Sequence, residues 1–81
     1  MPQASELSAL AQKCPIKTQE VVAVFLEDNN ILAAQRALLS AIDECFRVKS
    51  ITPEEAVEAY KIIDLQEEEM AHVRRRYGPK R

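Results

Sequence analysis

The sequence is poor in glycine, tryptophan and long apolar runs. Of its 81 residues, one is glycine, four are proline and none is tryptophan. Strands joined by tight turns need more glycine and more β-branched runs, so we predict helices almost throughout. A single glycine also excludes glycine-rich phosphate loops, and no serine has a glycine elbow. We therefore expect that the protein is not an enzyme.

Long apolar segments are also missing. No run approaches the ~18 apolar residues that a membrane-spanning helix requires. The first twelve residues contain no Arg or Lys, which an amphipathic targeting peptide would carry. We therefore expect a soluble, cytoplasmic protein that does not contact a membrane.

Cysteine and histidine are scarce. Cys14 and Cys45 are isolated, and His72 is the only histidine. Structural zinc sites use short paired spacings, which these residues lack, so reduced and mostly buried thiols are the preferred interpretation, with a disulfide as a minor alternative. Glu69-x-x-His72 is half of the motif that binds di-iron centres in helical bundles. A second copy of the chain would have to complete it, so we expect no metal or cofactor and keep a dimeric metal-binding protein as a minor alternative.

The punctuation of the chain predicts a single all-α domain spanning residues 1–81. Residues 1–30 form two short helices, separated by Cys14-Pro15, and Thr18 is the expected N-cap of the second. An asparagine turn leads into a core helix over 31–49, and Thr52-Pro53-Glu54-Glu55 forms a capping box for a helix over 53–77. Gly78-Pro79 ends that helix, and residues 78–81 are a basic tail.

These elements predict a small four-helix bundle, in which two short N-terminal helices pack on a long helical hairpin. The core helix is apolar on two sides, as expected for a helix packed from two directions. At 1.5 Å per residue, a helix over 53–77 would be about 37 Å long, and its distal half would stay uncovered. The large core side chains are expected to be Leu38, Leu39, Ile42, Phe46, Tyr60 and Ile63.

Charge is distributed unevenly. Residues 1–70 hold thirteen acids and six bases, a net charge of −7, whereas residues 71–81 carry +5 and no acid. An acidic body with a basic end is the strongest charge signal of the chain. The bases of that end are Arg74, Arg75, Arg76, Lys80 and Arg81.

Residues about 5–42 resemble the three-helix pattern of ubiquitin-associated (UBA/CUE) domains. The matching features are a short helix ending near Cys14-Pro15, the Glu20-Val21-Val22 segment, the Asn29-Asn30 turn and Ala37-Leu38-Leu39. The resemblance implies a UBA-like shape for this half of the chain. The family's ubiquitin-contacting loop is Met-Gly-Phe or Met-Phe-Pro, and Lys13-Cys14-Pro15 keeps only its proline.

A small protein-binding module is the function that the sequence favours: an adaptor, a chaperone-like subunit or an inhibitor of a larger protein. The apolar surface of the core helix and the uncovered distal helix also predict self-association, most simply as a two-fold dimer. The alternative is a nucleic-acid-associated regulator, because guanidinium groups pair with phosphates and tyrosine stacks on bases. The expected partner-binding residues are Met70, Val73 and Tyr77 as apolar anchors and Arg74, Arg75 and Arg76 as a charged rim.

Overall fold

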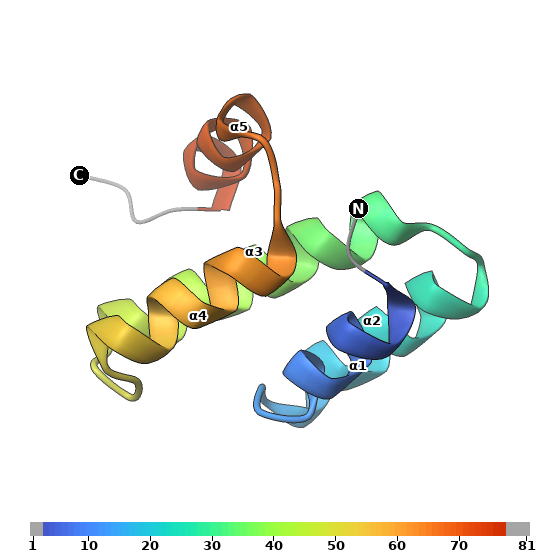
Figure 1. Cartoon of the computed structure of the whole chain (residues 1–81), viewed down its shortest axis with the longest axis horizontal. Helices are drawn as coiled ribbons and strands as arrows, with labels where there is room; N and C mark the ends of the chain where they lie inside the picture. Colours follow the sequence, from blue (N-terminus) through green and yellow to red (C-terminus); the bar gives the residue numbers. More distant parts are fainter. Residues whose placement is uncertain (1–2, 78–81) are drawn as a thin grey trace.

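The computed structural model describes residues 3–77, and within them the chain is all-α and has no strand. The predicted all-helical class is therefore confirmed. Five helices are present in the described range, one more than the sequence predicts. No helix within it has the length and apolar character needed to cross a membrane. The helices are α1 (Ala4–Ala11), α2 (Ile16–Glu27), α3 (Ile31–Arg47), α4 (Pro53–Ile63) and α5 (Glu67–Tyr77) (Figure 1).

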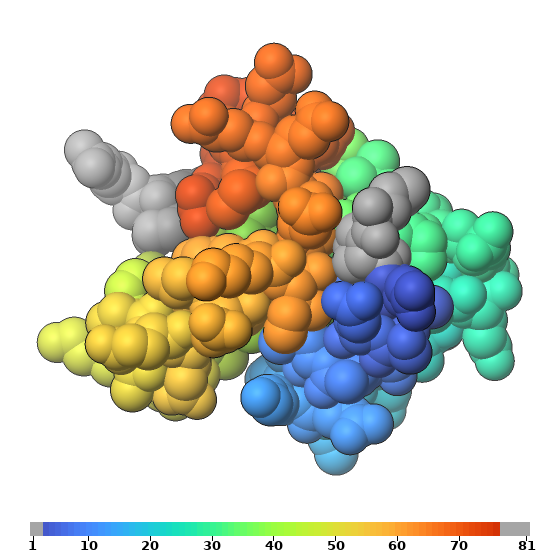
Figure 2. Space-filling model, viewed as in Figure 1, coloured from blue at the N-terminus to red at the C-terminus, as the bar shows by residue number. Residues whose placement is uncertain are grey.

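Helix α3 is the centre of the fold, as its two apolar stripes predict. It contacts each of the other four helices. Helices α3 and α4 lie side by side, α1 and α2 pack together beside them, and α5 turns back over α3 (Figure 1). In the space-filling view, α1, α4 and α5 cover the near face and leave α3 visible only at the edges (Figure 2).

Side-chain caps mark the starts of α3 and α4. The Oγ1 atom of Thr52 accepts a hydrogen bond from the backbone N–H of Glu55 at 3.2 Å, and the Glu55 side chain accepts from the Thr52 N–H at 3.1 Å. This capping box is the predicted one. The Asn30 side chain caps α3 by accepting from the Ala33 N–H at 3.2 Å. Helix α2 begins after Pro15, so Thr18 lies inside the helix and is not its N-cap.

The predicted helix over 53–77 is the main error of the sequence analysis, because α4 ends at Ile63 and α5 begins at Glu67. Asp64 ends α4 in the left-handed region, with φ 53° and ψ 42°. Aspartate enters that region more readily than most residues, so the break needs no glycine. The buried Gln35 side chain donates to the Ile63 carbonyl at 2.7 Å, which satisfies an acceptor at the new helix end. The predicted stop at Gly78-Pro79 and the basic tail over 78–81 lie outside the described residues.

The core lies where α3 meets the other helices. Four of the six predicted large core residues are buried, and Tyr60 is half-buried. Phe46 is 41% exposed, contrary to prediction, because it lies in the last turn of α3, beyond the part that α5 covers. The largest fully buried side chains are Leu7, Leu38, Leu39, Ile63, Val22 and Val73.

Candidate protein-binding surface

Helix α5 turns its apolar side toward the core, so the predicted anchors do not form an exposed strip. Val73 is 1% exposed and belongs to the core cluster, and Met70 is half-buried against it. The turn at Asp64 causes this difference, since it folds α5 back onto α3 instead of extending it away from the body. Arg75 and Arg76 are exposed, and the side chain of Tyr77 lies outside the described part of the structure.

Arg74 is held by an aspartate and a tyrosine rather than presented to solvent alone. Its Nε atom donates to Asp43 Oδ2 at 2.9 Å, and the Tyr60 hydroxyl donates to Asp43 Oδ1 at 2.6 Å. The Arg74 guanidinium also lies over the Tyr60 ring, with its carbon 5.4 Å from the ring centroid, within cation–π range. Burial, followed by the hydrogen bond to Asp43, raises the pKa of Tyr60 above its ordinary value. These three residues join α3, α4 and α5.

A second polar contact fixes α5 nearer its start. Arg36 donates to Glu69 Oε2 from Nη2 at 2.7 Å and from Nε at 3.0 Å. On α3 the basic residue Arg36 comes before the acidic residue Asp43. On α5 the order is reversed, because the acidic residue Glu69 comes before the basic residue Arg74. Exposed ion pairs are individually weak, contributing about 0–1 kcal/mol. Two pairs of opposite polarity nevertheless oppose sliding of α5 along α3.

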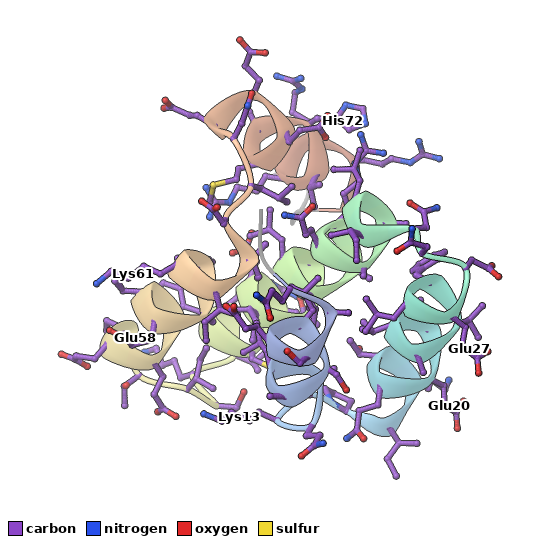
Figure 3. The ribbon with its side chains drawn as sticks, turned by 45° about the vertical axis from the view of Figure 1, so that its right-hand side comes forward. Lys13, Glu20, Glu27, Glu58, Lys61 and His72 are labelled. Atoms are coloured by element: carbon purple, nitrogen blue, oxygen red, sulfur yellow. The ribbon has the colours of Figure 1, made fainter. Side chains whose placement is uncertain are left out.

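The half-motif Glu69-x-x-His72 does not converge with other ligands in the described chain. The Glu69 carboxylate is occupied by Arg36, and the His72 side chain points outward on α5 (Figure 3). Within residues 3–77, no group of three His, Cys, Asp or Glu side chains is placed to hold a metal ion. A dimeric metal site would therefore have to break an ion pair before Glu69 could act as a ligand.

A groove runs between α3 and α5, and we call it the α3–α5 groove. It has a volume of about 720 Å³ and a mostly apolar lining. Small side chains of α3 lie along it, Phe46 stands at its edge, and both charge signs lie on its rim. Two rim pairs are already satisfied, Asp43 with Arg74 and Glu44 with Arg47. The lining residues are Thr18, Ala37, Ser40, Ala41, Asp43, Glu44, Phe46, Arg47, Tyr60, Val73 and Arg74.

A smaller groove of about 480 Å³ continues toward α2 and shares Thr18, Ala37 and Ser40 with the first. Its α2 side is formed by Lys17, Val21 and Phe25.

The cysteines carry no reactive signature. Cys14 is buried and its Sγ lies 3.8 Å from the Leu10 carbonyl oxygen, while Cys45 is half-buried, and neither forms a disulfide. Burial, with a smaller contribution from the neighbouring Cys45, raises the pKa of the Cys14 thiol and keeps it protonated. The predicted burial of the thiols is confirmed for Cys14, whereas Cys45 is only half-buried.

Three residues that organise this surface were missed from the sequence: Gln35, Asp43 and Tyr60 in its role as a hydrogen-bond donor. One signal for Asp43 was present, because it lies seven residues after Arg36 and therefore on the same side of α3. Arg36 and Asp43 on α3 have opposite charges, and Glu69 and Arg74 on α5 carry the complementary charges. This pattern indicates two helices that pair through their polar edges. Gln35 gave no such signal.

Comparison with protein-family models, with curated proteins and with solved structures finds no significant match. The resemblance of residues 5–42 to the UBA/CUE pattern therefore stays a prediction about shape.

Proposed function

We propose that this protein is a small, non-enzymatic protein-binding module that receives a helical segment of a partner protein in the α3–α5 groove. The observation that carries the proposal is Phe46. A large aromatic side chain, 41% exposed, stands at the edge of an apolar groove lined by Ala37 and Ala41. Aromatic residues, phenylalanine among them, are enriched at protein–protein interfaces relative to the rest of the surface.

The groove suits a helix better than an extended strand. Alanine and serine along α3 allow another helix to approach closely, and an amphipathic helix would place its apolar side over Ala37 and Ala41. The rim carries both charge signs, so it would orient a partner helix rather than select a highly charged one. The partner-binding residues are therefore revised from the apolar side of α5 to this groove, to which α5 contributes Arg74 at the rim.

The test compares two variants, each of which replaces an exposed apolar side chain with serine. Phe46→Ser alters the groove, whereas Val57→Ser removes an apolar side chain that is 50% exposed on α4 and lines neither groove. Tagged wild type and both variants are used for affinity capture from the native host, with and without nuclease. A partner retained by wild type and Val57→Ser after nuclease, and reduced at least tenfold in Phe46→Ser, is the expected result.

The captured partner is then titrated into isotope-labelled protein. The proposal predicts amide chemical-shift changes concentrated in residues 37–47. Equal capture by Phe46→Ser and wild type, or shift changes confined to α1 and α4, would show that the groove is not the binding surface. Capture that disappears with nuclease would instead favour the nucleic-acid-associated regulator.

A further inference from the structure

Helix α2 has an open side that carries a short apolar seam. Among the described helices, α2 packs only on α1 and α3. Lys17, Val21, Val24 and Asp28 follow one another at spacings of four, three and four, which places them along one stripe of a helix. Val21 is 45% exposed and Val24 is 55% exposed, and Lys17 and Asp28 are exposed at the two ends. We call these four residues the α2 seam.

The charges of this seam are reversed with respect to the dipole of their own helix. Lys17 lies in the first turn of α2 and Asp28 is its C-cap, whereas acids stabilise helix starts and bases stabilise helix ends. Each of the other four helices has an acid in its first turn or a base in its last turn. Neither Lys17 nor Asp28 forms an ion pair with a residue in the described range. The fold therefore leaves both charges without a stabilising partner within α2.

We propose that the α2 seam binds the α2 seam of a second copy of this chain in an antiparallel, two-fold arrangement. Reversing the seam and laying it on itself places Val21 opposite Val24 of the second copy. The same register places Lys17 opposite Asp28 of the second copy, at both ends of the interface. Each Lys17 then also lies beside the C-terminal end of the opposing α2, where a cation is favoured.

The charges select this arrangement over a parallel one. A parallel pair would set Lys17 against Lys17 and Asp28 against Asp28, which is repulsive at both ends. Only the reversed orientation joins opposite signs, so the seam is complementary to itself under a two-fold axis. It spans only about 16 Å, at 1.5 Å per residue. Because stable interfaces bury about 800 Å² on each partner, an interface built on three helical turns is expected to be weak and concentration-dependent.

Two acids beside the seam limit the affinity and provide a test of the register. Glu20 and Glu27 project from the same outer side of α2 (Figure 3). In the antiparallel pair, Glu20 of one copy lies near Glu27 of the other, and the two carboxylates repel. Glu20→Lys would convert this repulsion into attraction twice in each dimer and is expected to tighten it about threefold or more. Glu58→Lys, the same charge change on the outer side of α4, is the matched control and should leave the association unchanged.

The principal experiment is sedimentation equilibrium of the full chain from micromolar to millimolar concentrations. Lys17→Asp and Asp28→Lys should each weaken the dimer roughly fivefold or more, because each sets like charges against each other at both ends. Each substitution improves the charge pattern of α2 for its own dipole, so the fold should be retained. An equimolar mixture of the two variants should restore association, since both contacts between positions 17 and 28 then join opposite signs.

The double variant carrying both substitutions should also restore it. A wild type that stays monomeric up to millimolar concentration would overturn the proposal. So would association that responds equally to Lys17→Asp alone and to its mixture with Asp28→Lys, because the interface would then lie elsewhere. Lys17 and Val21 also line the smaller groove, whereas Asp28 lines neither groove and Phe46 is not part of the seam. Asp28→Lys and Phe46→Ser therefore report on separate surfaces.

Discussion

Gln35 provides the most direct test of why the chain turns between α4 and α5. It is the only buried polar side chain among residues 3–77, with 4% of its surface exposed. Its Nε2 atom donates to the carbonyl of Ile63, the last residue of α4, at 2.7 Å. Gln35→Met approximately keeps the length and volume of the side chain and removes its amide group, which contains the donor. The substitution therefore leaves a buried carbonyl without its partner.

The cost can be estimated from that carbonyl. Leaving a buried backbone acceptor unsatisfied costs about 1–3 kcal/mol. In a domain of 60–100 residues, each kcal/mol lowers the midpoint of thermal unfolding by about 4–8 °C. We therefore expect Gln35→Met to unfold between about 4 and 24 °C below the wild type. Circular dichroism at 222 nm, followed during heating and during urea titration, measures this change.

The control is Gln12→Met, at an exposed position that makes no side-chain hydrogen bond within the described chain. That variant should stay within about 0.5 kcal/mol of the wild type. If Gln35→Met unfolds within 2 °C of Gln12→Met, on the scale of about 4–8 °C per kcal/mol, the hydrogen bond does not stabilise the turn. The reasoning on the helix break would then be refuted.

Three further predictions concern local chemistry. Thr52→Ala removes the N-cap of α4 and should lower the free energy of unfolding by about 1 kcal/mol in urea titration. In a Tyr77→Phe background, ultraviolet titration should show that Tyr60 ionises above its ordinary pKa of 10.0. The contribution of the protonated Tyr60 hydroxyl to the free energy of unfolding is therefore full below pH 10.0. This contribution is lost as the pH rises through the raised folded-state pKa. Alkylation at neutral pH, followed by peptide mass spectrometry, should modify Cys45 before the buried Cys14, and equal rates would contradict the burial of Cys14.

The features predicted correctly from the sequence depend on interactions between near neighbours. The Thr52 capping box and the Asn30 cap both join residues three apart, so they can be predicted from a short stretch of sequence. The buried positions of α3 follow from helical spacing for the same reason. The turn at Asp64 has a different origin, since it combines a tolerant aspartate with a hydrogen bond from Gln35, 28 residues earlier. No local pattern specifies that partner.

The exposed apolar strip predicted on the distal helix is absent for the same physical reason. Val73 and Met70 look like an exposed strip only if α5 continues straight from α4. Because the chain turns at Asp64, Val73 packs against α3 and is buried. The interruption of the apolar pattern at Gln66 and the acids that open α5 were signals of a new helix start, although the absence of proline and glycine there favoured continuity.

The contact between Arg74 and Asp43 also provides a test that distinguishes a nucleic-acid partner from a protein partner. To bind a phosphate, Arg74 would have to leave a carboxylate that it contacts at 2.9 Å and 3.4 Å. Asp43→Asn keeps the shape of the side chain, removes its charge and weakens its contact with the Arg74 guanidinium. If nucleic acid is the ligand, this variant should bind a labelled single-stranded oligonucleotide more tightly than the wild type in fluorescence anisotropy, and the binding should weaken steeply with salt. If the α3–α5 groove binds a protein helix, the same variant disturbs the rim and weakens capture of that protein. Tighter salt-dependent oligonucleotide binding together with undiminished protein capture would therefore overturn our assignment of the groove.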